Sequence, residues 1–72
     1  MNYYEIVIRY DKDSVDCIIF KDTQMALSSN GIIDIAVQRG LLDLELCRKV
    51  EIAQSLSGSE YKYIKQLTQR KI

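Results

Sequence analysis

Two segments near the N-terminus carry the period-two pattern of half-buried β-strands, and this pattern constrains the fold most strongly. In residues 3–10, one face of an extended chain carries apolar and aromatic side chains, which are Tyr4, Ile6, Ile8 and Tyr10. Residues 15–20 form a second run rich in β-branched and aromatic residues. The intervening Asp-Lys-Asp-Ser at 11–14 consists of short polar residues typical of turns. The sequence therefore predicts an N-terminal β-hairpin.

A central helix is predicted over residues 24–39 from the spacing of its apolar residues. Asp22 or Thr23 is the candidate cap, and Gly40 stands where a helix would end in a left-handed residue. The predicted buried stripe consists of Met25, Ile32, Ile35 and Ala36, with Ile33 and Val37 at its edges. This helix is expected to pack on the hairpin.

The segment Ser28–Gly31 leaves an alternative open. Asn-Gly between apolar segments is a hairpin signal, and a glycine inside a helix costs about 1 kcal/mol relative to alanine. A helix is favoured because residues 32–37 do not alternate cleanly. A second helical stretch from Gly31 to Arg39, with Asn30 as its cap, is the other interpretation.

Residues 43–56 fit both a helix capped by Asp43 and a strand, in which Val50 and Ile52 alternate with charged residues. We expect a third strand near residues 48–54, because it would complete the sheet that the hairpin begins.

A C-terminal helix is predicted from Ser59 to about Arg70. Ser57 and Glu60 have the spacing of a capping box, and Ser59 is a competing cap. The predicted fold class is α+β: an N-terminal hairpin packed with a central helix, a third strand and a C-terminal helix. The length of 72 residues predicts a single domain over residues 1–72.

The absence of histidine argues against an enzyme and against a metal site. Histidine is the side chain that most often performs acid–base chemistry near neutral pH, and it is the commonest metal ligand. Asp11, Asp13 and Asp16 lack the spacing of a calcium loop, and the three glycines are too scattered to cradle a phosphate. We therefore expect no catalytic residues, no metal and no cofactor.

The two cysteines, Cys17 and Cys47, are expected to be free thiols, because no secretory signal or basic, apolar leader is recognisable at residues 1–5. This predicts a cytoplasmic protein. The apolar runs are much shorter than the roughly 20 residues of a membrane span, so no membrane segment is expected.

The small size predicts self-association. A core of this size rarely supplies more than about 3–5 kcal/mol, and burial of further apolar surface in a homodimer would support it. We therefore expect a small cytoplasmic protein-interaction or accessory module, without catalytic activity, that forms a homodimer and binds a protein partner the sequence does not identify.

The distribution of charge supports an alternative function. Ten basic and ten acidic residues balance, but residues 37–72 hold seven basic and four acidic ones. Near the C-terminus, basic groups stand beside tyrosines, an arrangement that can hold phosphates and stack on bases. The less favoured alternative is therefore a nucleic-acid-binding regulator. The candidate residues for contact with nucleic acid or a partner are Tyr61, Lys62, Lys65, Arg70 and Lys71.

Overall fold

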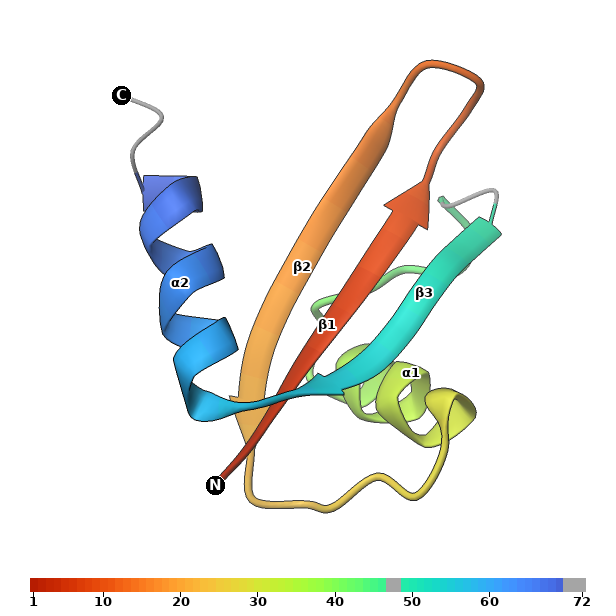
Figure 1. The fold of residues 1–72 in the computed structure, drawn as a ribbon. Helices are drawn as coiled ribbons and strands as arrows, with labels where there is room; N and C mark the ends of the chain where they lie inside the picture. Colours follow the sequence, from red (N-terminus) through yellow and green to blue (C-terminus); the bar gives the residue numbers. More distant parts are fainter. Residues whose placement is uncertain (47–48, 70–72) are drawn as a thin grey trace.

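The fold combines a three-stranded antiparallel sheet with two helices, as predicted for the α+β class (Figure 1). The computed structural model describes residues 1–46 and 49–69. Its elements in chain order are β1 (Asn2–Arg9), β2 (Val15–Asp22), α1 (Ser29–Gln38), β3 (Lys49–Leu56) and α2 (Gly58–Gln69). The strand order is β2-β1-β3, so β1 is the central strand.

The predicted hairpin is confirmed. Tyr4 lies opposite Phe20, and Ile6 opposite Ile18. In the turn, Oδ1 of Asp11 accepts hydrogen bonds from the backbone N–H groups of Asp13 at 2.8 Å and Ser14 at 2.9 Å. These two bonds lower the pKa of the Asp11 carboxyl below its ordinary value. The Asp11 side chain therefore stabilises the turn of the hairpin.

The predicted third strand is also confirmed, and the helical alternative for these residues is wrong. β3 pairs antiparallel with β1. Val7 lies opposite Ile52 and Ile8 opposite Val50, so Glu51 is the extra residue of a bulge. Its Oε1 accepts a hydrogen bond from Nε of Arg9 at 2.6 Å, which lowers the pKa of Glu51. Residue 48, at the start of the predicted strand, lies outside the described residues.

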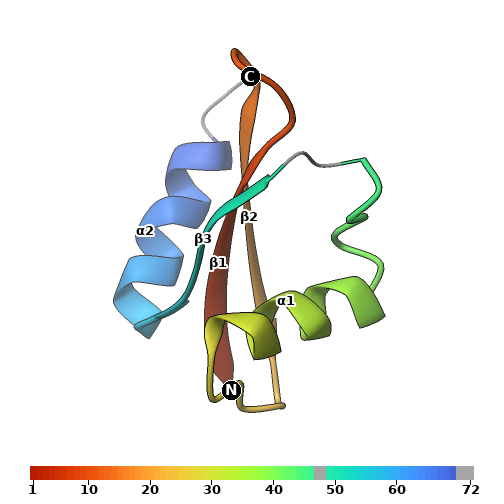
Figure 2. The same cartoon turned by 90° about the vertical axis from the view of Figure 1, so that its right-hand side faces the viewer.

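The two helices lie on opposite faces of the sheet (Figure 2). We call the face that carries Tyr4, Ile6 and Ile8 the back face, and α1 packs on it. The opposite face carries Tyr3, Glu5 and Val7, and we call it the front face; α2 lies on this side, where Tyr61 contacts Tyr3. No helix in the described ranges is long and apolar enough to cross a bilayer.

The main core lies between α1 and the back face. Tyr4, Ile6 and Ile8 are at most 1 % exposed. The core is completed by buried side chains from β2, from α1 and from the segment after α1: Phe20, Ile32, Ile35, Ala36 and Leu42. At the start of α1, Oγ of Ser29 donates a hydrogen bond to the carbonyl of Ala53 at 2.9 Å, which links this helix to β3.

The start of the central helix differs from the prediction. α1 begins at Ser29 rather than residue 24, and its cap is Ser28, whose Oγ accepts a hydrogen bond from the N–H of Gly31 at 3.2 Å. Neither Asn30, Asp22 nor Thr23 caps it. Asn30 and Gly31 therefore form part of the first turn of α1, and no hairpin forms there.

The hydroxyl of Tyr4 explains the later start. It donates to the carbonyl of Gln24 at 2.7 Å and accepts from the N–H of Ala26 at 2.9 Å, so both backbone groups are used in a connection instead of a helix. Met25, predicted as part of the buried stripe, is consequently 72 % exposed. The end of α1 is as predicted: Gly40 has a φ of 72°, and the N–H of Leu41 bonds the carbonyl of Ala36 at 2.9 Å.

The predicted C-terminal helix and its capping box are confirmed. The N–H of Ser57 donates to Oε1 of Glu60 at 2.9 Å, and the N–H of Glu60 donates to Oγ of Ser57 at 3.1 Å. The helix begins at Gly58, one residue after the cap. Arg70, at the predicted end, lies outside the described residues.

Candidate interaction surfaces

The front face is only partly covered by α2. The ring centroids of Tyr3 and Tyr61 lie 4.8 Å apart, which anchors the first turns of the helix to the sheet. Farther along, Ile64 is half-buried, and Leu67 is 46 % exposed. The apolar side chains of α2 are therefore only partly covered by the sheet.

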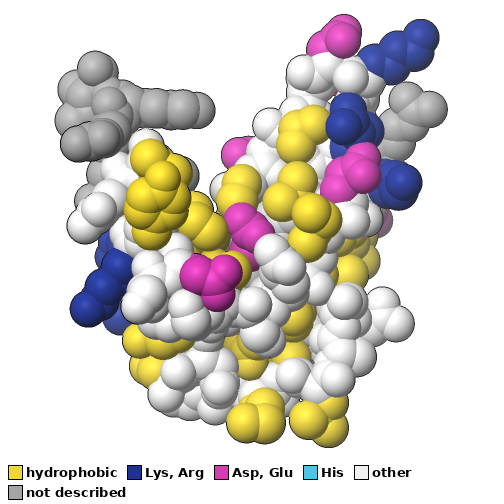
Figure 3. Space-filling view, viewed as in Figure 1, with side chains coloured by type: hydrophobic (Ala, Val, Ile, Leu, Met, Phe, Trp, Pro, Cys, Tyr) yellow, Lys and Arg dark blue, Asp and Glu magenta, His cyan; other side chains and the backbone are white. Residues whose placement is uncertain are grey.

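A groove separates α2 from the uncovered part of the front face. Figure 3 shows the surface hollowed at this place, with apolar side chains on both walls and acidic side chains at the floor. On the front face of the sheet, Val15 is 50 % exposed and Ile52 is 46 % exposed, and on α2 the exposed apolar residues are Tyr63 and Leu67. We call this hollow the front groove.

Glu5 brings a negative charge to the centre of the front face. Its Oε1 accepts a hydrogen bond from Nε2 of Gln54 at 2.7 Å, and its Oε2 accepts from Sγ of Cys17 at 3.3 Å. Among the described residues, no lysine or arginine forms an ion pair with this carboxylate. Glu5 is therefore a half-buried acidic group on the front face that no described lysine or arginine neutralises.

The Cys17 thiol is poorly suited to nucleophilic chemistry. Burial and the hydrogen bond to Glu5 raise its pKa to about 11. A thiol attacks as its thiolate, and reactive cysteines have lowered pKa values. Cys17 therefore acts as a protonated hydrogen-bond donor to Glu5. Cys47 lies outside the described residues.

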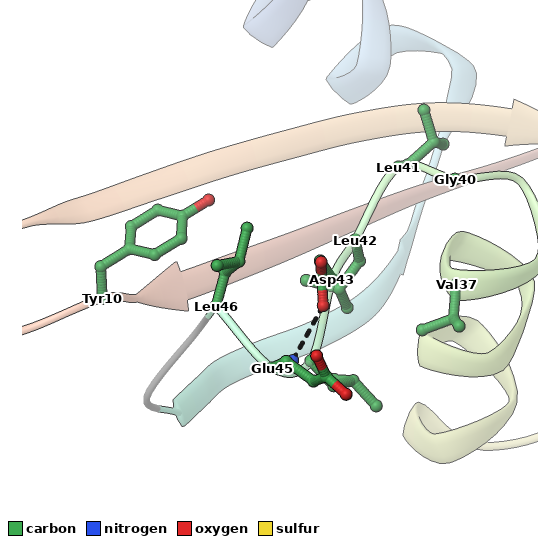
Figure 4. A pocket seen from close by; sticks show the side chains of 9 residues that line it. Tyr10, Val37, Gly40, Leu41, Leu42, Asp43, Glu45 and Leu46 are labelled. Atoms are coloured by element: carbon green, nitrogen blue, oxygen red, sulfur yellow. Dashed lines mark hydrogen bonds between the residues drawn. The ribbon is translucent and has the colours of Figure 1, made fainter.

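A second concave surface opens where the back core ends, and we call it the leucine pocket. It has a volume of about 630 Å³ and is lined by Tyr10 after β1, by Val37 of α1 and by the segment from Gly40 to Leu46 (Figure 4). Exposed apolar residues at this pocket are Tyr10, Val37, Leu41, Leu44 and Leu46.

The leucine pocket follows from an alternation of leucines and acids after α1. Leu42 is buried in the core, but the chain around it keeps Leu41 and Leu44 on the surface, and Leu46 is 72 % exposed. Oδ1 of Asp43 accepts a hydrogen bond from the N–H of Glu45 at 2.9 Å, which turns the chain (Figure 4). A search for catalytic residue types could not find this surface. The sequence signal is a loop segment that carries four leucines, more than the core can bury.

Asp22 and Arg39 form an ion pair that the sequence analysis also missed. Nε of Arg39 lies 2.7 Å from Oδ2 of Asp22, which is 6 % exposed. The hydrogen bond from Arg39 and that from the N–H of Gln24 lower the pKa of Asp22. The pair joins the end of β2 to the end of α1, and its partners stand 17 residues apart.

The candidate contact residues of the C-terminal helix are only partly brought together. The Tyr61 ring packs on Tyr3, and Nζ of Lys65 lies 5.9 Å from the centroid of the Tyr61 ring. Lys62 is exposed. Arg70 and Lys71 lie outside the described residues, so the proposed basic cluster stays a prediction.

Chemistry-bearing clusters are scarce in the described part of the chain. No group of three or more cysteine, aspartate or glutamate residues within residues 1–46 and 49–69 is placed to hold a metal ion. Comparisons with protein-family models, curated proteins and solved structures found no match for this chain. Evidence about function therefore comes from the two concave surfaces.

Proposed function

We propose that this protein is a small, non-catalytic cytoplasmic interaction module that self-associates as a homodimer through the front groove. The observation that carries the proposal is the pair of unequal walls of this groove. One wall is a sheet surface with exposed Val15 and Ile52, and the other is a helix with exposed Tyr63 and Leu67. The apolar side of a helix can cover an apolar sheet surface.

In a dimer with two-fold symmetry, the helix wall of each copy would contact the sheet wall of the other. In such an interface the same surface on both copies is self-complementary. The α2 helix of one copy would cover the open sheet of its partner, and the partner's α2 would do the same in return. Burial of the exposed apolar side chains is the driving force.

Light scattering coupled to size exclusion, over a wide range of protein concentrations, tests the proposal. We expect a dimer at micromolar concentration. Leu67→Lys should give a monomer, because it places a charge in the apolar wall. Leu27→Lys is the matched control, since Leu27 is exposed outside the groove, and it should leave the dimer intact. A monomer at every concentration, or equal behaviour of the two variants, would refute the proposal.

Nucleic-acid binding remains the alternative, and a mobility-shift titration separates it from self-association. The Tyr61 ring already packs against Tyr3, with the ring centroids 4.8 Å apart. We therefore expect no binding of single- or double-stranded probes tighter than about 10⁻⁵ M at physiological salt. Submicromolar binding that falls steeply with salt would favour the regulator instead.

A further inference from the structure

The leucine pocket is separate from the front groove and needs its own explanation. It lies at the end of the back core, next to the C-terminal end of α1, whereas the groove lies across the sheet beside α2. Its volume of about 630 Å³ falls within the range of roughly 300–1,000 Å³ that is usual for ligand pockets. Leu41, Leu44 and Leu46 remain exposed around it, at the cost of contact between apolar surface and water.

The charged residues that the structure describes at the pocket have one sign. Within residues 1–46 and 49–69, the lining contains Asp43 and Glu45 but no lysine or arginine. The Asp43 carboxylate already accepts a hydrogen bond from the N–H of Glu45. The Glu45 carboxylate forms no hydrogen bond or ion pair with another residue of the described part. An apolar hollow therefore lies beside an acidic group that can accept a cation.

We propose that the leucine pocket docks a short segment of a partner protein with basic and apolar residues. The segment would place one large aliphatic or aromatic side chain among Leu41, Leu44 and Leu46, and a lysine or arginine beside Glu45. Burial of the anchor supplies affinity, and the charge pair supplies orientation and selectivity.

Charge also decides against a second copy in a pocket-to-pocket contact. Such an interface would bring Asp43 and Glu45 of one copy close to the same two acids of the other. Like charges placed together across an interface are unfavourable. The partner must therefore present the opposite sign.

The test uses two synthetic ten-residue peptides as probes. They share the same leucine and phenylalanine anchors, but the remaining positions are lysine in one and glutamate in the other. Binding to the full chain is measured by calorimetry at physiological salt. We expect the lysine peptide to bind at least about tenfold tighter than the glutamate peptide, as a close interfacial charge pair would produce.

Two variants with the same change of net charge make the test specific. Glu45→Lys should weaken the lysine peptide by about tenfold and strengthen the glutamate peptide. Asp34→Lys, at an exposed position of α1 outside the leucine pocket, should change neither affinity by more than about twofold, since separated surface charges are screened by salt. Leu46→Ser should weaken both peptides, because it removes an apolar contact.

Several outcomes would overturn the proposal. Equal affinity of the two peptides for the unmodified protein would show that no charge pair forms with Glu45. An equal effect of Glu45→Lys and Asp34→Lys would show only a general charge effect. Loss of the dimer in Glu45→Lys would show that a second copy occupies the pocket. Leu67→Lys should leave peptide binding unchanged, so failure of the dimer and failure of the pocket remain distinguishable.

Discussion

The two faces of the sheet use the same three strands but are covered to different extents. On the back face, α1 lies across the strands, and Tyr4, Ile6 and Ile8 are almost completely removed from water. On the front face, α2 contacts Tyr3 near its own start, while Val15 and Ile52 remain about half exposed. One face is a closed core, and the other is an open surface.

The connections to the two helices explain the difference. α1 is held at both ends, by the Ser28 cap and the Ser29–Ala53 bond at its start and by the turn at Gly40 at its end. α2 follows β3 after Ser57 alone, so its start is fixed while the rest of the described helix rises beside the sheet (Figure 1). The free energy of folding should therefore come mainly from the back face, and self-association from the front face.

The largest expected effect is a core truncation on the back face. Ile6→Ala should lower the free energy of unfolding by about 2–5 kcal/mol, because it leaves a cavity in a fully buried site. Ile52→Ala on the front face should cost about 1 kcal/mol or less in the monomer. Urea denaturation of both variants at low protein concentration gives the two values. Similar losses would mean that the two faces are equally packed.

The next effect concerns the Tyr4 hydroxyl, which bonds two backbone groups of the connection to α1. Tyr4→Phe should lower the free energy of unfolding by about 1–3 kcal/mol, since it leaves these groups without their partner. Tyr63→Phe is the matched control on the exposed side of α2 and should have no measurable effect. Thermal and urea unfolding would compare them, and a neutral Tyr4→Phe would contradict the role of this hydroxyl.

A smaller effect is expected at the start of α2. Ser57→Ala removes half of the capping box and should cost about 1 kcal/mol. Hydrogen exchange should become faster within α2 but not within α1, because only the front helix depends on this cap. Ser59→Ala, at the other candidate cap, should leave exchange unchanged. Equal acceleration in both helices would mean that they unfold as one unit.

The smallest effect is pH-dependent and tests the ion pair that closes the back face. The pKa of Asp22 is lowered from 3.8 by its hydrogen bond with Arg39. Its stabilising contribution is therefore complete above the ordinary pKa and is lost as the pH falls through the lower, folded-state value. The Arg39 side chain is 56 % exposed, so solvent screening keeps the effect small.

Thermal midpoints measured from neutral pH downward would test this linkage. Both Asp22→Asn and Arg39→Gln should reduce the fall in midpoint below about pH 4, because each removes the pair that lowers the pKa. A variant with an unchanged acid profile would show that other carboxylates, such as Asp11 or Glu51, dominate the acid response.

Local patterns were sufficient to predict most elements. The alternation in residues 3–10 and 15–20, the turn at Asp11 and the Ser57–Glu60 capping box each depend on neighbours a few residues apart. Periodicity in β3 was ambiguous, and the need of the hairpin for a further strand decided it correctly. The predicted start of the central helix was wrong, because the hydroxyl of Tyr4, about 20 residues away in sequence, hydrogen-bonds the backbone groups of Gln24 and Ala26.

The sequence by itself determined the fold class, the hairpin and the position of Gly40, because backbone preferences and side-chain alternation are local properties. Only the tertiary structure decided which apolar residues stay in water. Leu42 is buried while Leu41, Leu44 and Leu46 line a pocket, and Phe20 is buried while Val15 on the same strand lies exposed at the front groove. These residues have similar hydrophobicity, so their exposure depends on where two helices happen to cover a three-stranded sheet.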